Sequence, residues 1–319
     1  MGFNRENYAK IKAEYDGKYL RAEQEAQFRK SEIHALLPEV AKIDSELSMS
    51  GVRVYEAAIS GDKARINQIA DENLQLIEKR GRLLVAAGFP SDYTDVKYEC
   101  IHCGDTGVVE HRMCKCLKEK LILAGLETSG MSELIKSQTF DNFDLGFYTG
   151  EAKARMSAIL EIAKKYANSF DPEKSGSIIM MGNTGLGKTH VSSAMGGIII
   201  NNGFDVYYST AVDMMADFEN ERFSNVKSDS LRSEKYFSCE LLIIDDLGTE
   251  LINQFTTSCL YNVINSRLIK KKPTIINTNF TREDLRKKYM DRITSRIFGE
   301  YTVLPFLGTD IREKKLQKK

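Results

Sequence analysis

The sequence predicts an α/β protein, in which a parallel sheet with helices on both faces follows a helical segment and a small cysteine-rich module. From about residue 151 onward, short apolar runs alternate with helical stretches, and one predicted strand leads into a glycine-rich loop. Upstream, four of the six cysteines fall between residues 100 and 116. We therefore expect a helical domain over 1–97, a cysteine module over 98–120, a linker over 121–150 and the α/β domain over 151–319.

Composition limits the class of protein. The 319 residues are 42% hydrophobic and 28% charged, which is ordinary for a soluble globular chain. Equal numbers of basic and acidic residues, 45 of each, mean that nucleic-acid binding must rest on local patches such as 270–272, 286–288 and 312–319, although each also suits a solvated surface. No apolar run approaches the roughly 18–20 residues that span a bilayer, and the N-terminus lacks a signal-peptide core, so we expect a cytoplasmic protein without a membrane segment.

Residues 4–90 are predicted to be helical. Apolar residues recur there at spacings of three and four, and an earlier, similar rhythm breaks near Pro38. The later stripe, which Gly88 and Pro90 end, comprises Ile66, Ile69, Leu74, Ile77 and Leu84. Two interpretations remain open: the helices pack on one another as a small bundle, or they form an arm whose exposed stripe docks on a partner protein.

The cysteine module favours a bound metal. Two close pairs of thiols are joined by a glycine-containing turn: Cys100, Cys103, Cys114 and Cys116. Such spacing suits tetrahedral Zn²⁺, whose binding energy can fold a segment this short. His102 or His111 could replace one thiol. Four protein ligands close the coordination shell, so we expect structural zinc rather than a catalytic metal.

The α/β domain is predicted from five apolar runs. Their continuous apolar character is typical of strands covered on both faces, as in a parallel sheet. The runs are 177–181, 205–209, 241–245, 274–279 and 301–306. Cys239 and Cys259 lie in apolar surroundings and are expected to be small buried hydrophobes. The preceding linker ends in "FDNFDLGFYTG", which is dense in aromatic residues.

The stretch "GNTGLGKT" matches the P-loop pattern G-x-x-x-x-G-K-[ST]. Glycines let backbone N–H groups curl around phosphates, and the following helix offers them its positive end. We expect Lys188 to neutralise the β- and γ-phosphates and Thr189 to bind Mg²⁺. The sequence lacks the Asn-Lys-x-Asp motif with which GTPases recognise guanine, so ATP is favoured over GTP. The nucleotide-binding residues are Gly182, Asn183, Thr184, Gly185, Leu186, Gly187, Lys188 and Thr189.

Acidic and amide side chains follow two later strands. "LLIIDDLG" delivers Asp245 to the carboxyl edge of the sheet, where it would hold Mg²⁺ directly or through water. Asp246 is placed to polarise the attacking water. Asn279, at the tip of "TIINTN", would line the γ-phosphate if its strand lies between the two motif strands.

Three arginines are candidates for transition-state contacts. Arg292 and Arg296 lie four apart on one predicted helical face. Either could reach a neighbouring subunit's site as an arginine finger, which requires an oligomer, or both could be surface arginines. Arg312 follows the last strand and could reach back to the phosphates.

This order of motifs resembles the AAA+ ATPases of the bacterial helicase loaders (DnaC and DnaI type) and their relatives, the IstB-like transposition helpers. The resemblance covers residues 140–313 closely, and a helical domain followed by a Cys-x-x-Cys module looks like the DnaI-type architecture. It implies an AAA+ P-loop sheet. Because the chain ends seven residues after Arg312, at 319, we expect it to lack a full lid domain.

The resemblance also implies residue roles. Most AAA+ members carry glutamate where this chain has Asp246, which implies slow or stimulus-dependent hydrolysis. The implied roles are Walker A for Lys188 and Thr189, Walker B for Asp245 and Asp246, sensor 1 for Asn279, arginine finger for Arg296 and sensor 2 for Arg312.

The function implied by the resemblance is an ATP-switched loader. Its arm would bind the replicative DNA helicase, its ATPase domain would bind single-stranded DNA, and the chain would oligomerise at least on the helicase. Aromatic and cationic residues after the second strand suit DNA, although Phe218 equally suits a core position. These candidates are Phe218, Arg222, Phe223 and Lys227.

Two alternatives remain. In a transposition helper, the chain typically begins close to the ATPase domain and carries no zinc module, so residues 1–117 argue against that role. A nucleotide-binding scaffold with negligible turnover is the other alternative, and ATPase assays on Lys188→Ala and the wild type would distinguish it.

Overall fold

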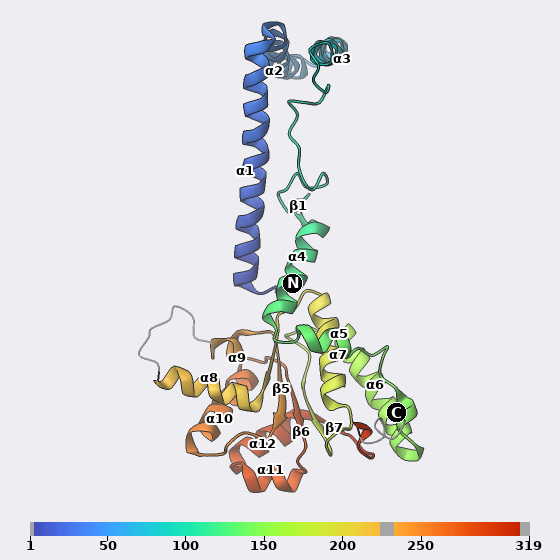
Figure 1. Ribbon diagram of the computed structural model, residues 1–319, viewed down its shortest axis with the longest axis vertical. Helices are drawn as coiled ribbons and strands as arrows, with labels where there is room; N and C mark the ends of the chain where they lie inside the picture. Colours follow the sequence, from blue (N-terminus) through green and yellow to red (C-terminus); the bar gives the residue numbers. More distant parts are fainter. Residues whose placement is uncertain (1–2, 224–232, 313–319) are drawn as a thin grey trace. The chain divides into compact units, whose positions relative to one another are not determined.

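The computed structural model describes residues 3–223 and 233–312 and divides into two compact units (Figure 1). One unit comprises Lys12–Cys116. The other combines Met1–Ile11 with Leu117–Lys319. The helices and the cysteines therefore share a unit, and the P-loop lies in the other. No helix in the described ranges is long and apolar enough to cross a membrane.

Three helices precede the cysteines, with a break at the predicted proline: α1 (Arg5–Leu36), α2 (Pro38–Ile59) and α3 (Lys63–Ala86). Pro38 occupies the first turn of α2, where its missing N–H costs no helical hydrogen bond. The Asp62 carboxylate caps α3 by accepting from the Arg65 N–H. Ile33, Val40 and Leu84 form a small buried cluster that joins the three helices.

The predicted stripe on α3 is only partly buried. Ile69 and Leu84 are buried, whereas Leu74 and Ile77 are 61% and 53% exposed. Helix α2 adds further exposed apolar side chains, which are Met49, Val52, Tyr55 and Ile59. The helices thus pack on one another and still present an apolar face to solvent.

All five predicted strands form one parallel sheet: β3 (Ser177–Met181), β4 (Val206–Thr210), β5 (Leu241–Leu247), β6 (Thr274–Thr278) and β7 (Tyr301–Pro305). Their order across the sheet is β4-β5-β6-β3-β7. Strand β6 lies between the P-loop strand β3 and the acidic strand β5, as Asn279 requires for the role predicted from the sequence.

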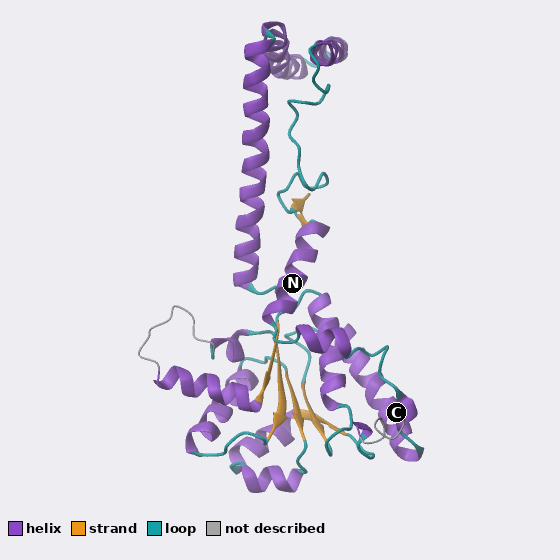
Figure 2. Cartoon of the chain, viewed as in Figure 1, coloured by secondary structure: helices purple, strands orange, loops and turns teal. Residues whose placement is uncertain are grey.

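Helices cover both faces of this sheet, and the strands between them are visible in Figure 2. One face carries α5 (Ser132–Ser137), α6 (Gly150–Asn168) and α7 (Lys188–Asn201), and the other carries α8 (Ala211–Phe223), α9 (Glu234–Ser238), α10 (Gln254–Ile269), α11 (Arg282–Lys288) and α12 (Asp291–Glu300). Successive residues such as Ile243 and Ile244 enter opposite cores, which explains the continuous apolar runs. Cys239 and Cys259 are buried, as predicted.

The segment that the sequence predicts as a linker, 121–150, lies in the same unit as the sheet. It contains most of α4 (Lys115–Thr128), then α5 and the 3-10 turn Leu145–Phe147. Met131 is fully buried in the core beside α7, and the Tyr208 N–H of edge strand β4 donates to the Ser129 carbonyl at 2.9 Å. Its apolar side chains pack on the core, so the segment forms part of the folded domain.

Candidate nucleotide site and metal centre

The P-loop connects β3 to α7, as predicted. Gly182 has a φ of 149°, and a Cβ there would lie 2.3 Å from the Phe306 carbonyl oxygen. Gly187 has a φ of 84°, and a Cβ there would lie 2.9 Å from the Phe143 ring. Both positions therefore require glycine, because a side chain would be strained and would displace a neighbour.

Lys188 is held inside this loop. Its ammonium group donates to the Gly182 carbonyl at 2.7 Å, the Asn183 carbonyl at 2.8 Å and Asn279 Oδ1 at 2.7 Å. The side chain is buried, and burial lowers the pKa of Lys188 to about 8 despite the opposing charges of Asp246 and Asp245. Among the described residues, no carboxylate directly contacts this ammonium group, so the loop carries a positive charge that suits an incoming anion.

A cavity of about 330 Å³ lies against the loop. One wall consists of residues 184–190, and another is the segment 138–147. Asp246, Thr249, Asn279 and Arg312 also line it. Of the residues predicted to bind nucleotide, Thr184 to Thr189 line the cavity, whereas Gly182 and Asn183 hold Lys188.

The aromatic wall was missed by sequence reasoning. Phe143 lies edge-on to His190, with ring centroids 5.0 Å apart, and Phe147 lines the same cavity. The Tyr148 hydroxyl donates to the Leu186 carbonyl at 2.9 Å and joins this wall to the P-loop. Flat apolar groups of this kind suit a nucleobase. The density of aromatics in "FDNFDLGFYTG" was the signal that could have found them.

Asp245 lies behind the cavity and is almost fully buried. The Tyr208 hydroxyl donates to its Oδ2 at 2.7 Å, and Asn277 Nδ2 and the Asp246 N–H donate to its Oδ1 at 2.9 and 3.0 Å. In the described part of the chain, the buried Asn277 carboxamide oxygen has no hydrogen-bond partner. A carboxylate beside an unsatisfied acceptor fits a hydrated Mg²⁺, whose bound waters supply donors.

Asp246 points into the cavity because of a local irregularity. The register between β5 and β6 shifts between Ile244 and Leu247, which is a β-bulge, and Asp246 has a φ of 52°. Burial raises the pKa of Asp246, and the charge of Asp245 adds to this effect. Asn279 Nδ2 donates weakly to its Oδ1 at 3.4 Å. The two adjacent aspartates therefore lie in different environments: Asp245 is buried, and Asp246 lines the cavity.

The arginines separate into two groups. Arg312 lines the cavity, and its neighbour Ile311 donates its N–H to the Gly185 carbonyl at 3.1 Å. In contrast, neither Arg292 nor Arg296 is among the described residues that line the cavity. Arg296 Nε donates to Asn265 at 2.8 Å, so its guanidinium lies on the α10 side of α12.

The residues proposed for DNA contact are only partly described. Phe218 packs into the core, where its ring stacks on Tyr236 at a centroid distance of 5.7 Å. The Arg222 guanidinium lies 4.8 Å from the centroid of the Phe255 ring. Lys227, the side chain of Phe223 and residues 313–319 of the basic tail lie outside the described residues.

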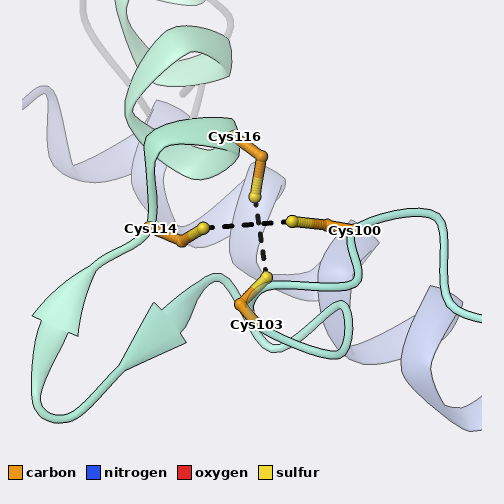
Figure 3. Close-up of side chains that lie close together, drawn as sticks. All are labelled: Cys100, Cys103, Cys114 and Cys116. Carbon is orange, nitrogen blue, oxygen red and sulfur yellow. Dashed lines mark hydrogen bonds between the residues drawn. The ribbon is translucent and has the colours of Figure 1, made fainter.

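The four module cysteines lie together in the other unit (Figure 3). Their sulfurs lie within 4.8 Å of one another, with Cys100 and Cys114 at 3.9 Å and Cys103 and Cys116 at 3.6 Å. Zinc–sulfur bonds of about 2.3 Å in a tetrahedron place sulfurs about 3.8 Å apart. The donor set therefore fits Zn²⁺.

Backbone contacts hold the thiols in place. The buried Asp105 carboxylate accepts from the Glu99 and Cys100 N–H groups, both at 2.8 Å, and the Gly107 N–H donates to the Cys103 sulfur at 3.3 Å. A hairpin of β1 (Val108–Val109) and β2 (Arg112–Met113) then leads to the second pair. His102 and His111, the alternative ligands, are exposed.

Comparison with known families accords with this geometry. A family model described as "IstB-like ATP binding protein" matches residues 125–313. The chain belongs to the IstB-like ATP-binding protein family. The match begins inside the segment predicted as a linker, in agreement with its packing against the sheet of this IstB-like protein.

Relatives of this IstB-like protein include helicase loaders. It is 26% identical over 185 residues to the replicative helicase loader DnaC of Buchnera aphidicola, covering 57% of this chain and 71% of that protein. It is 25% identical over 169 residues to the replicative helicase loader DnaC of Escherichia coli, covering 53% and 66%. The phage-like element PBSX protein XkdC of Bacillus subtilis is 26% identical over 240 residues, covering 70% and 85%.

Solved structures similar to this IstB-like protein include a DnaC helicase loader and DnaI. The first is 20% identical, covers 55% of this chain and 99% of that chain, and has a TM-score of 0.47. The second is 18% identical, covers 55% and 91%, and has a TM-score of 0.44.

Proposed function

We propose that this IstB-like protein is an ATP-dependent loader of the replicative DNA helicase in the cytoplasm. The observation that carries the proposal is a nucleotide cavity in a chain that also holds a separate helical unit with an apolar face. Relatives named replicative helicase loader support the choice of partner. The ATPase unit binds single-stranded DNA, and ATP state controls the release of the helicase.

Different residues in and beside the cavity bind the phosphates, the metal and the base of Mg·ATP. When bound, Mg²⁺ neutralises charge on the β- and γ-phosphates. Lys188 and Thr189 hold the phosphates and the metal, and Asp245 orients the metal directly or through water. Phe143 and Phe147 contact the base. Arg312 contacts the phosphates from the end of the described chain, as a sensor 2 residue.

Hydrolysis uses Asp246 and Asn279, the sensor 1 residue, to orient the attacking water in the cavity. The aspartate is one methylene shorter than glutamate, so its carboxylate is held less closely to the phosphates and turnover is slow without a partner. Arg296 completes the site of a neighbouring subunit in a homo-oligomer and supplies charge to the transition state. ATP therefore acts mainly as a conformational latch.

The helical unit binds the helicase. Apolar side chains on α2 and α3 that remain exposed supply the contact, because burying them against a partner releases water. Zn²⁺ on the four cysteines stabilises this unit as a closed structural site and takes no part in hydrolysis.

Co-purification with the replicative helicase tests the proposal. The full-length chain is expected to retain the helicase in the presence of a non-hydrolysable ATP analogue, and Tyr55→Asp is expected to abolish retention because it places a charge on the apolar face. Leu251→Asp is the matched control, since Leu251 is an exposed apolar residue of the ATPase unit. Absence of a complex with and without nucleotide would contradict the loader role.

A transposase helper is the second candidate, and the family description favours it. A pull-down from the native host distinguishes the two, because a loader retains the helicase and a helper retains a transposase. A scaffold without turnover is recognised by phosphate release that is equally absent from wild type and Lys188→Ala, with and without single-stranded DNA.

A further inference from the structure

Tyr208 contacts both Asp245, beside the nucleotide cavity, and Ser129, in the segment that packs against the edge of the sheet. Its hydroxyl donates to Asp245 Oδ2 at 2.7 Å, on the side of the carboxylate opposite to Asn277. Its backbone lies in β4, one of the two edge strands of the sheet, and its N–H donates to the Ser129 carbonyl at 2.9 Å. One residue therefore contacts both the metal-binding carboxylate and the segment outside the sheet.

This outer segment fits closely against Tyr208. Gly130 has a φ of 73°, and a Cβ there would lie 2.9 Å from the Tyr208 carbonyl oxygen. The next residue, Met131, is fully buried and contacts α7 at Gly196. The backbones of 129–131 and β4 thus approach as closely as a glycine allows, and a shift of one must be accommodated by the other.

The N-terminal segment and the end of α4, which both belong to this unit, contact each other and the region of β4. The unit ends at Ile11 and resumes at Leu117. Asn7 Nδ2 donates to Thr128 Oγ1 at 3.0 Å, which joins the base of α1 to the end of α4. Asn4 Nδ2 lies 3.5 Å from the Asp205 carboxylate just before β4. Residues 128–131, which we call the anchor segment, therefore lie with the N-terminal segment at the sheet edge formed by β4.

We propose that Tyr208 is a positioning residue for Asp245 and that it transmits metal–nucleotide occupancy to the anchor segment 128–131. The inference rests on the proposed binding of Mg·ATP. The phenol fixes one carboxylate oxygen, so that the other side of Asp245 keeps the orientation a hydrated metal requires. When the carboxylate adjusts to the metal, the hydrogen bond moves Tyr208, and β4 carries this displacement to Ser129.

Metal dependence of nucleotide binding tests the positioning role in the full-length protein. In Tyr208→Phe, the Mg²⁺ concentration that half-saturates binding of a fluorescent ATP analogue is expected to rise about tenfold, the usual cost of losing a hydrogen-bond partner of a metal ligand. Affinity for the analogue in excess chelator is expected to stay unchanged. Tyr207→Phe is the matched control, because Tyr207 contacts Tyr236 on the other side of the same strand.

Hydrogen exchange tests the transmission. In the wild type, exchange of the amides of 128–131 is expected to slow when Mg²⁺ and a non-hydrolysable ATP analogue are added. In Tyr208→Phe, this response is expected to disappear even at saturating Mg²⁺. Gly130→Ala is expected to reduce the response without changing the Mg²⁺ requirement, since it alters the anchor and leaves the hydroxyl contact with Asp245 in place.

Each result has a definite consequence. An unchanged Mg²⁺ requirement in Tyr208→Phe, or an equal rise in Tyr207→Phe, overturns the positioning role. A persistent exchange response at 128–131 in Tyr208→Phe overturns the transmission. Failure of the wild type to bind the analogue at any Mg²⁺ concentration overturns the proposed function itself, and is thereby distinguished from failure of this inference.

Discussion

Asp246 illustrates how one backbone conformation separates two neighbouring carboxylates. A φ of 52° is uncommon for residues other than glycine, and aspartate and asparagine tolerate it best. The bulge at this point turns Asp246 toward the cavity while Asp245 stays buried in the sheet. Sequence identifies both as acids after a strand, and the bulge distinguishes their environments.

Asp246→Asn separates backbone conformation from charge. Asparagine tolerates the same φ, so we expect affinity for the ATP analogue to stay within about twofold of wild type. Stimulated phosphate release is expected to fall by at least about a hundredfold, because a carboxamide cannot accept a proton from the attacking water. Parallel binding and phosphate-release assays check this, and Asp144→Asn, on the cavity rim, is the control. Undiminished release would remove Asp246 from the proposed mechanism.

Among the elements, the cysteine hairpin has too little apolar mass to fold by burial. Its two strands have two residues each, and three of their four residues are exposed. The order of this module therefore depends on the sulfur cluster and on Asp105. The helices beside it in the same unit are instead joined by a small apolar cluster and by an ionic contact at Asp44.

Removal of the metal tests the module. Elemental analysis of the purified chain is expected to give one zinc ion per chain, and Cys103→Ser is expected to lose it, because three thiolates leave the tetrahedral shell open. Affinity for the ATP analogue is expected to be unchanged, since no cysteine is among the described residues lining the nucleotide cavity. Cys259→Ser, in the core of the ATPase unit, should keep its zinc. Zinc loss in His102→Ala would instead indicate a histidine ligand.

The contacts of Asp44 predict that the stability of the helical unit depends on pH. Its carboxylate accepts from His34 Nε2 and Arg80 Nε, both at 2.7 Å, and so joins α1, α2 and α3. Burial alone would raise the pKa of Asp44, but these two partners outweigh it and the pKa is lowered. A lowered pKa stabilises the fold above the unfolded value of about 3.9, and this stabilisation is lost as pH falls through the folded value.

Asp44→Asn is therefore expected to reduce the free energy of unfolding of this unit by about 2 kcal/mol at pH 7. The difference from wild type should stay constant down to about pH 5 and shrink below about pH 4. Calorimetry of the full-length chain measures it, with Glu78→Gln on the exposed side of α3 as control. A difference that grew on acidification would contradict the assignment.

At the scale of the whole molecule, we expect Arg296 to act only when several chains assemble. It does not line the cavity of its own chain, and it lies over the Tyr261 ring at 4.9 Å from the ring centroid. Because Arg296 lies outside the cavity of its own chain, we propose that it enters the site of a neighbouring chain. Intrachain contacts with Asn265 and Tyr261 would then be exchanged for contacts with phosphate.

A complementation experiment tests this exchange. Arg296→Ala is expected to keep nucleotide affinity and to lose stimulated phosphate release by about a thousandfold, the usual contribution of an arginine finger. Mixing Arg296→Ala chains with Lys188→Ala chains is expected to restore part of the activity, because one supplies the nucleotide and the other the arginine. Arg292→Ala is the control. Equal inactivity of the mixture and of Arg296→Ala alone would exclude action between subunits.

Local patterns account for much of what could be predicted. The P-loop and the Asp245–Asp246 pair follow from residue spacing beside apolar runs, and Pro38 marks a helix boundary for a steric reason that holds in any fold. The same holds for the cysteine pairs, whose spacing suits one metal. The prediction that residues 121–150 form a linker was wrong, because the sequence alone does not show where an apolar residue such as Met131 packs. In the structure, Met131 is buried in the core of the ATPase unit.

The order of motifs along the chain was therefore enough to indicate a nucleotide-binding α/β domain and a cysteine cluster, since both depend on short segments with fixed backbone requirements. Folding decided which distant residues surround them. Tyr208 reaches Asp245, and Phe143 covers Gly187, because parallel strands joined by crossovers bring remote segments to one edge of the sheet. Such contacts depend on strand order and on the depth of each side chain, which spacing along the chain does not encode.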